Sequence, residues 1–157
     1  MLILLDIDGV MVSACSWKAP ELLNDGFPAF TKKASEALQR IINETNADIL
    51  LTTSHKEKYS ISEWYDIFNL RGLKVNKIDC LPENANHSSR KDEIINWYQG
   101  NKIHESFVII DDDKSLNTLP NNIKKKVIQT SPMIGLTNEY VHNAIAILQK
   151  EEIFDLV

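Results

Sequence analysis

The sequence lacks the features that mark membrane-spanning, disulfide-stabilised and repetitive proteins. No apolar run approaches the ~18 residues that a membrane span requires, and we find no internal repeat, low-complexity tract or linker. Cys15 and Cys80 are too few for a disulfide framework, so we expect reduced thiols. No basic segment precedes the apolar run Met1–Leu5, which argues against a signal peptide. We therefore expect a cytoplasmic protein that starts with a buried strand and has no membrane partner.

What is present is the composition of an ordinary globular domain. The chain has 157 residues, of which 43 % are hydrophobic and 25 % charged. A chain of this length buries roughly two-thirds of its unfolded surface, so we predict a single domain over residues 1–157. The net charge of −5 disfavours nucleic acid as a partner unless a local basic patch forms. Residues that could form one are Lys56, Lys58, Arg90, Lys91 and Lys124–Lys126, although we expect the last run on a solvated surface.

Short apolar segments alternate with amphipathic ones along the chain. The strand-like segments are 2–5, 48–51, 75–78, 107–110 and 127–128. The helical segments run over 34–45, from a capping box at Ser60 and Glu63 to Gly72, from Ser88 or Ser89 to Gly100, and from a cap at Thr137 through Leu148. Residues 11–30 fit neither pattern and are predicted to form a flap or loop. The alternation predicts βαβ units and a three-layer α/β/α sandwich around a Rossmann-like parallel sheet.

Three of the strand-like segments end in polar side chains. The first runs into Asp6 and Asp8, the second into Thr52, and segment 107–110 into Asp111 and Asp112. The carboxyl ends of parallel strands meet at one edge of a sheet, so these carboxylates and the hydroxyl are expected to converge there. Carboxylates held so close together repel one another. Mg²⁺ is the usual cation for carboxylates shared with a phosphate, so we predict a Mg²⁺ site.

Four motifs follow one another in order along the chain. They are Asp6-Ile7-Asp8-Gly9-Val10, the strand ending in Thr52, a basic residue that opens a helix, and the strand ending in Asp111-Asp112. This ordered set resembles the haloacid dehalogenase (HAD) superfamily of phosphohydrolases over nearly the whole chain.

A closer similarity is to a small capless branch, the HAD domain of Swiss Army Knife RNA repair proteins. The residues that carry it are Leu5–Val10, Thr52–Ser54, Arg90–Ile94 with Trp97, and Val108–Asp113. His55-Lys56 stands where that branch usually has an aromatic–basic pair, and Met11 stands where leucine is common.

The resemblance implies a role for each carboxylate. Asp6 would be the nucleophile that forms an aspartyl-phosphate intermediate. Asp8 would protonate the leaving oxygen and then activate the hydrolytic water. Asp6 and Asp111 would contact Mg²⁺ directly, Asp112 would bind it through water or orient its ligands, and Asp8 would contribute its backbone carbonyl. Asp113 is expected to begin the next turn instead.

The resemblance also implies contacts to the phosphoryl group. Thr52 would hydrogen-bond a phosphoryl oxygen, and Thr53 and Ser54 are alternatives if the strand ends one residue later. Arg90 would neutralise the phosphoryl charge, with its neighbour Lys91 as the alternative. A cation at the start of a helix opposes the helix dipole, so it is expected to have an anionic partner.

Three further residues are candidates for substrate contact. Gly9 would let the backbone turn sharply and clear the site. His55 is the histidine we place near the site, and the four histidines show no metal-ligand spacing. Trp17 lies in the 11–30 segment, where a substrate would be gripped.

We therefore predict a Mg²⁺-dependent phosphohydrolase that acts on a phosphomonoester. The motif spacing leaves no room for a large cap domain, and in this superfamily that implies an open site. The substrate would be a small ester or a macromolecular phosphate such as a nucleic-acid end. The alternative is a non-catalytic HAD-like domain that binds phosphate or nucleic acid, against which the presence of both Asp6 and Asp8 argues. A response-regulator receiver has similar acidic residues in a different order.

Overall fold

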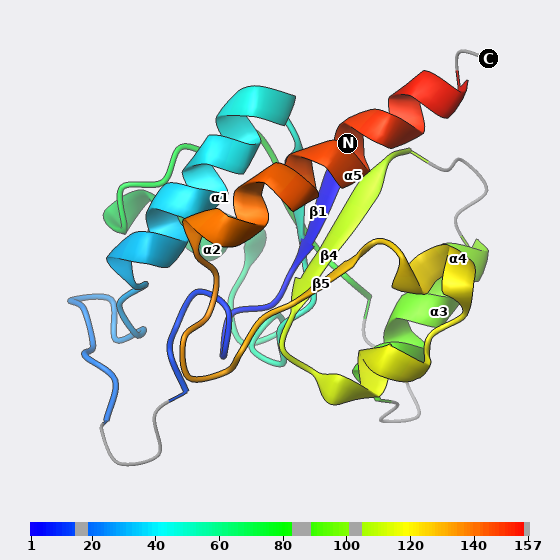
Figure 1. The fold of residues 1–157 in the computed structure, drawn as a ribbon. Coiled ribbons are helices and arrows are strands. Elements are labelled where there is room, and N and C mark those ends of the chain that lie inside the picture. Colours follow the sequence, from blue (N-terminus) through cyan, green and yellow to red (C-terminus); the bar gives the residue numbers. More distant parts are fainter. Residues whose placement is uncertain (15–18, 83–88, 101–104, 156–157) are drawn as a thin grey trace.

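A parallel five-stranded sheet forms the centre of the structure (Figure 1). The structure is a computed structural model that describes residues 1–14, 19–82, 89–100 and 105–155, with the backbone alone for 150–155. The strands are β1 (Leu2–Leu5), β2 (Asp48–Leu51), β3 (Ile78–Cys80), β4 (Phe107–Asp111) and β5 (Val127–Gln129). Their order is β3-β2-β1-β4-β5, and all four pairings are parallel.

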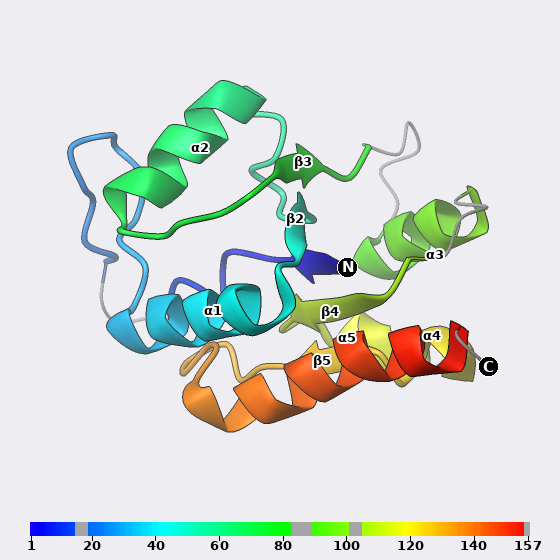
Figure 2. The same cartoon turned by 90° about the horizontal axis from the view of Figure 1, so that it is seen from above.

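Helices cover both faces of the sheet (Figures 1 and 2). The elements on one face are α1 (Lys32–Thr45), α2 (Ile61–Leu70) and α5 (Val141–Asp155), with the short turn η2 (Asn138–Tyr140) leading into α5. Those on the other face are α3 (Arg90–Gly100), η1 (Lys114–Thr118) and α4 (Asn121–Lys124). Alternate strand residues divide between the two cores: Ile3 and Leu5 join the first, Leu4 the second. The predicted three-layer α/β/α architecture is confirmed.

All five predicted strands are present, four of them at the predicted positions and one displaced along the chain. The segments 2–5 and 48–51 are strands over those residues, and 107–110 and 127–128 each extend by one residue. The strand predicted near 75–78 is present but lies later in the chain: β3 begins at Ile78, which pairs with Ile49 of β2. The preceding stretch alternates polar residues with one valine, so only the pairing with β2 determines where the strand starts.

Helix caps were predicted from short local signals, and most are present. Ser60 accepts from the backbone N–H of Glu63 at 3.1 Å, and Glu63 accepts from that of Ser60 at 3.0 Å. Ser89 accepts from the Asp92 N–H at 3.2 Å. The cap predicted at Thr137 is wrong, because this residue precedes η2 and α5 begins only at Val141. Within the described chain, the buried hydroxyl of Thr137 has no hydrogen-bond partner.

Residues 11–14 and 19–30, the described part of the segment predicted to form a flap or loop, contain no helix or strand. Two isolated bridges involve these residues, one between Asp8 and Val12 and one between Leu22 and Pro28. Arg71, at the end of α2, fastens this loop: its guanidinium pairs with both oxygens of Asp25, at 2.7 and 3.1 Å. The same group donates to the carbonyls of Phe27 and Pro28. The loop is therefore tied to α2 by a buried cation.

The structure places Lys126 in the interior and leaves Cys80 as a free thiol. Lys126 was expected on a solvated surface with its neighbours, but it is only 6 % exposed, and its ammonium lies 4.2 Å from the centroid of the Phe107 ring. Cys80 is a free thiol, as expected, while Cys15 lies outside the described residues. Among the described helices, none is long and apolar enough to cross a membrane.

Candidate active site

Three of the predicted site residues lie together at the carboxyl ends of β1, β2 and β4. Asp6 follows β1, and its backbone N–H donates to the carbonyl of Ile110 at 3.1 Å. Thr52 follows β2, and its N–H donates to the carbonyl of Leu5 at 2.9 Å. Asp111 is the last residue of β4. The hydrogen bonds of the sheet thus hold these three backbones beside one another, with all three side chains buried.

Three carboxylates form a cluster at this edge. Asp6, Asp111 and Asp112 each offer an oxygen, and these oxygens lie within 4.8 Å of one another. Asp6 is 5 % exposed and Asp111 is completely buried. The side chain of Asp8, expected to converge with them, points to His55 instead and is 55 % exposed. Of the four predicted carboxylates, the structure therefore brings three together.

Arg90 supplies the positive charge of the cluster. It is the first residue of α3, and its Nη1 lies 2.5 Å from Asp111 Oδ2 and 3.4 Å from Asp6 Oδ1. The same nitrogen donates to Thr52 Oγ1 at 3.4 Å. The anionic partners expected for a cation at a helix start are present. In the described part of the chain, Lys91 forms no ion pair, so the structure places Arg90 at the cluster and not its neighbour.

Burial dominates the electrostatics of this cluster. It raises the pKa of Asp6 to about 8, and the nearby Asp111 adds to the rise while Arg90 opposes it. The pKa of Asp111 is also raised by burial, against the effect of Arg90. Burial alone would lower the pKa of Arg90, but the two carboxylates outweigh it and raise that pKa. The cluster carries more negative charge than one guanidinium can balance.

Gly9 allows the loop after β1 to pass directly beside the cluster. Its φ is +81°, and a Cβ there would lie 2.1 Å from Asp112 Oδ2. Its carbonyl accepts a hydrogen bond from the buried Thr130 hydroxyl at 2.7 Å. Thr130 was not among the predicted residues. The available signal is weaker than for Thr52, because Gln129 separates this hydroxyl from the apolar pair Val127-Ile128.

The residues after Thr52 divide between the interior and the surface. Thr53 is buried, and its Oγ1 accepts from the His55 backbone N–H at 3.3 Å, within the turn. Ser54 is exposed. The His55 Nε2 lies 2.8 Å from Asp8 Oδ2. Thr52 is thus the hydroxyl of this segment that faces the carboxylate cluster.

Lys56 links this loop to α3. Its ammonium is buried and lies 3.2 Å from the Glu93 carboxylate, one turn beyond Arg90. Its carbonyl accepts from the Trp64 indole N–H at 3.2 Å. The prediction that Lys56 could contribute to a basic surface patch is therefore wrong. Only the three-dimensional contact with Glu93 explains why a lysine is buried here.

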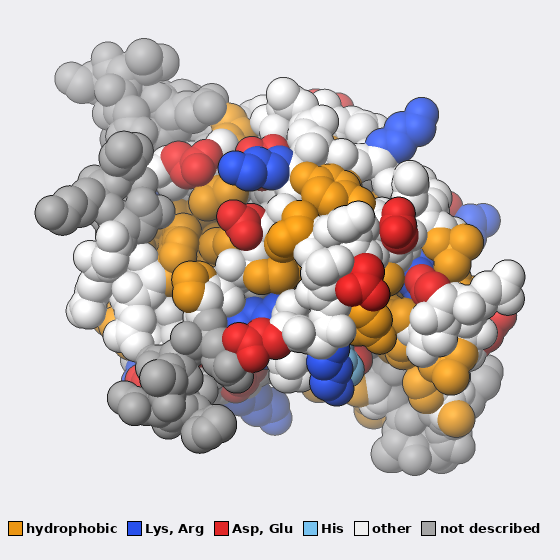
Figure 3. All heavy atoms as spheres, turned by 180° about the vertical axis from the view of Figure 1, so that it is seen from behind, with side chains coloured by type: hydrophobic (Ala, Val, Ile, Leu, Met, Phe, Trp, Pro, Cys, Tyr) orange, Lys and Arg blue, Asp and Glu red, His pale blue; other side chains and the backbone are white. Residues whose placement is uncertain are grey.

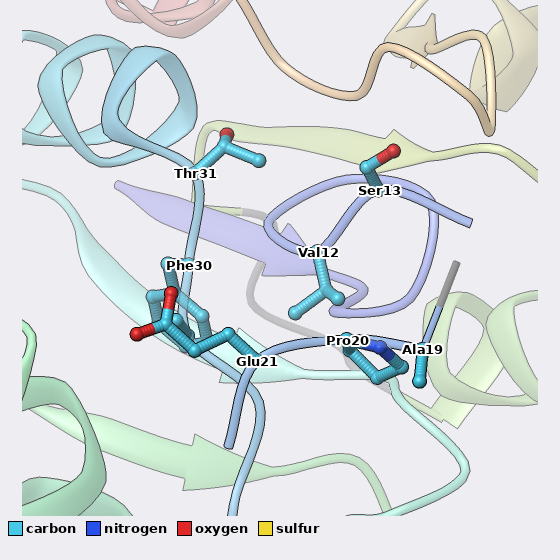
Figure 4. Close-up of a pocket in the computed structure, with 8 residues that line it drawn as sticks. Val12, Ser13, Ala19, Pro20, Glu21, Phe30 and Thr31 are labelled. Carbon is cyan, nitrogen blue, oxygen red and sulfur yellow. The ribbon is translucent and has the colours of Figure 1, made fainter. Parts of the chain in front are cut away.

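A cavity of about 380 Å³ lies beside the loop that follows β1. Figure 4 shows that its walls come from 12–13, from 19–21 and from 29–31, where the chain enters α1. Val12, Pro20 and Phe30 give it an apolar lining, with Glu21 as its charged residue. Trp17, the candidate for gripping a substrate, lies outside the described residues, as do His87 and His104, whereas His142 is exposed on α5.

Comparison with known protein families agrees with this geometry. The family described as the HAD domain in Swiss Army Knife RNA repair proteins matches residues 2–141, a span that includes every strand of the sheet and the whole carboxylate cluster. No curated protein matches the chain. A HAD domain suggests a phosphohydrolase, and the buried carboxylates are in keeping with one. The chain belongs to the family of HAD domains of Swiss Army Knife RNA repair proteins.

Proposed function

We propose that the protein hydrolyses phosphomonoesters, with Asp6 as nucleophile and Asp8 as general acid and base. The observation that carries this proposal is the buried cluster of Asp6, Asp111 and Asp112 around one guanidinium, at the edge where parallel sheets bind ligands. Membership of a HAD family supports the same reaction class.

The donor set of the cluster fits Mg²⁺. All three side chains offer carboxylate oxygens, which are the hard ligands that this ion prefers, and their excess negative charge is otherwise uncompensated. Asp6, Asp111, Asp112 and the backbone carbonyl of Asp8 would hold it. When bound, the ion would polarise a phosphoryl oxygen and offset its charge. The raised pKa of Asp6 supports a cation requirement, since a nucleophile must be ionised.

The proposed reaction has two balanced steps. An Asp6 carboxylate oxygen attacks phosphorus, the bond from phosphorus to the ester oxygen breaks, and Asp8 gives that oxygen a proton. Water then attacks the aspartyl phosphate and passes its proton to Asp8, and the bond from phosphorus to Asp6 breaks to release inorganic phosphate. Arg90 and Thr52, already within 3.4 Å of each other, would bind the phosphoryl oxygens in both steps.

For the substrate we propose a macromolecular phosphate, with the phosphorylated end of a nucleic acid as the leading candidate. The family description refers to RNA repair, and no cap domain covers the sheet edge in the part of the chain that the structure describes. The net charge is −5, and Figure 3 shows acidic and basic side chains interspersed on one described face. We therefore propose that contact is limited to the terminal phosphate and its nearest nucleotides.

Turnover of p-nitrophenyl phosphate with and without Mg²⁺ tests the reaction. We expect Asp6→Asn to lose turnover, while Asp66→Asn, at an exposed carboxylate on α2, keeps it. An active Asp6→Asn protein would refute the mechanism. Oligonucleotides with 5′- or 3′-phosphates, sugar phosphates and phosphopeptides then identify the substrate class. Binding of a phosphorylated oligonucleotide without any turnover would instead support the non-catalytic alternative.

A further inference from the structure

We infer that His55 is a positioning residue that holds the Asp8 carboxyl group in place for proton transfer. The role rests on the proposed function, in which Asp8 is the general acid and base. The Nε2 atom of His55 lies 2.8 Å from Asp8 Oδ2. Because an ionised carboxylate can only accept hydrogen bonds, the ring nitrogen is the donor when Asp8 is ionised.

His55 is restrained through its backbone and through its ring. Its backbone N–H donates to Thr53 Oγ1 at 3.3 Å, and the next residue is fixed by the buried pair of Lys56 and Glu93. On the other side, the Phe27 ring meets the imidazole edge to face, with the centroids 5.5 Å apart. The imidazole therefore has little freedom to leave Asp8.

The Phe27 ring is itself anchored by the loop around it. The Arg71 guanidinium lies 5.4 Å from its centroid. The guanidinium is itself held in place, because its N–H groups donate to Asp25 and to backbone carbonyls. The Trp64 ring packs against Phe27 from α2 at a centroid distance of 5.6 Å. A continuous set of contacts thus runs from α2 through the loop to the side chain of Asp8.

This arrangement decides which oxygen of Asp8 can serve the substrate. His55 occupies Oδ2, which leaves Oδ1 to carry the transferable proton. Without the histidine, a side chain that is 55 % exposed would rotate freely, and fewer of its orientations would reach the leaving oxygen. The sequence suggested that His55 contacts substrate, but its Nε2, the nitrogen farther from the backbone, is already engaged by Asp8.

The test compares two esters that differ in how much they need a general acid. An alkyl phosphate has a poor leaving group that must be protonated as it departs, whereas 2,4-dinitrophenyl phosphate does not. His55→Phe keeps a ring against Phe27 but removes the hydrogen bond, and His55→Gln retains a donor. His142→Phe, on the exposed face of α5, is the matched control. The quantity measured is kcat/KM, which reports the steps up to phosphoryl transfer.

We expect His55→Phe to lower kcat/KM for the alkyl ester by about tenfold or more and to change it less than about twofold for the dinitrophenyl ester. His55→Gln should recover most of the loss, and the His142 variant should match the wild type. Equal losses on both esters, or no loss on the alkyl ester, would overturn the positioning role alone. A wild type that turns over neither ester would overturn the proposed function and this role with it. If His55→Phe does not fold, His55→Leu is judged by the same ratio.

Discussion

Replacing Asp6 with asparagine should stabilise the metal-free protein at neutral pH, although the same change removes the proposed nucleophile. Asp6 is 5 % exposed, and its oxygens share a small space with those of Asp111 and Asp112. Its ionised form is disfavoured by burial and by the neighbouring carboxylate, which together raise its pKa to about 8. An asparagine has a similar shape and carries no charge, so it avoids this cost.

The magnitude follows from the difference between the folded and unfolded pKa values of Asp6. The folded protein keeps this proton up to about pH 8, whereas the unfolded chain releases it near 3.8. Between these values the folded state binds more protons, so the free energy of unfolding falls as pH rises, by at most ~1.4 kcal/mol per pH unit. By pH 7 the loss is about 4 kcal/mol, which corresponds to roughly 8–16 °C in Tm for a chain of this length.

Thermal unfolding in the presence of a chelator, at intervals from pH 5 to 8, measures this effect. The difference in Tm between Asp6→Asn and the wild type cancels the titrating groups outside the cluster and reports Asp6 together with its effect on Asp111. Asp66→Asn is the control for losing an exposed carboxylate. We expect the difference to grow with pH and to shrink when Mg²⁺ is added, since the ion stabilises the ionised wild-type cluster. A variant less stable than the wild type at pH 7, or a difference independent of pH, would refute the reasoning.

Two further pairs of variants test the cluster. Gly9→Ala and Gly26→Ala both place a side chain at positive φ and should each cost about 1–2 kcal/mol of stability. Only the new methyl group of Gly9→Ala meets the Asp112 carboxylate, so a titration of Tm with Mg²⁺ should show weaker Mg²⁺ binding for that variant alone. Equal Mg²⁺ affinities of the two variants would contradict the close approach of Gly9 to Asp112. Arg90→Met should cost roughly 3–5 kcal/mol of stability in chelator and abolish turnover, because it leaves buried carboxylates without their cation. Lys91→Met should leave both the unfolding curve and the turnover rate unchanged, and a comparable loss would mean that the wrong cation has been assigned.

The parts of the fold that could be predicted are those determined by local sequence. The apolar runs of β1 and β2 have strand length and end in carboxylate or hydroxyl residues, so their limits were readable from the sequence. The capping box of Ser60 and Glu63 is equally local. The start of β3 is not, because it depends on the alignment of Ile78 with Ile49, and no pattern within the polar stretch before Ile78 records that alignment.

The candidate site shows the same division. The motif order identified the carboxylates. Choosing Arg90 over Lys91 required the orientation of the first turn of α3, which determines which of the two side chains points to Asp111. The contacts of His55 with Asp8 and of Lys56 with Glu93 join segments far apart in the chain. Such contacts depend on the positions and orientations of the loops and helices relative to the sheet. Local sequence patterns contain no information about that packing geometry.

The charge of the cluster would allow an acidic protein to accept the proposed phosphate ester. Asp6, Asp111 and Asp112, when ionised, exceed the single charge of Arg90 by two, which is the charge of one divalent cation. With that cation the net charge of the chain changes from −5 to −3, and the phosphate meets a neutral cluster instead of a repulsive one. Substrate affinity should therefore depend on the metal more strongly than the overall charge suggests. A KM that rises as Mg²⁺ is withdrawn, at constant ionic strength, is the expected consequence, since screening of distant surface charges is then unchanged.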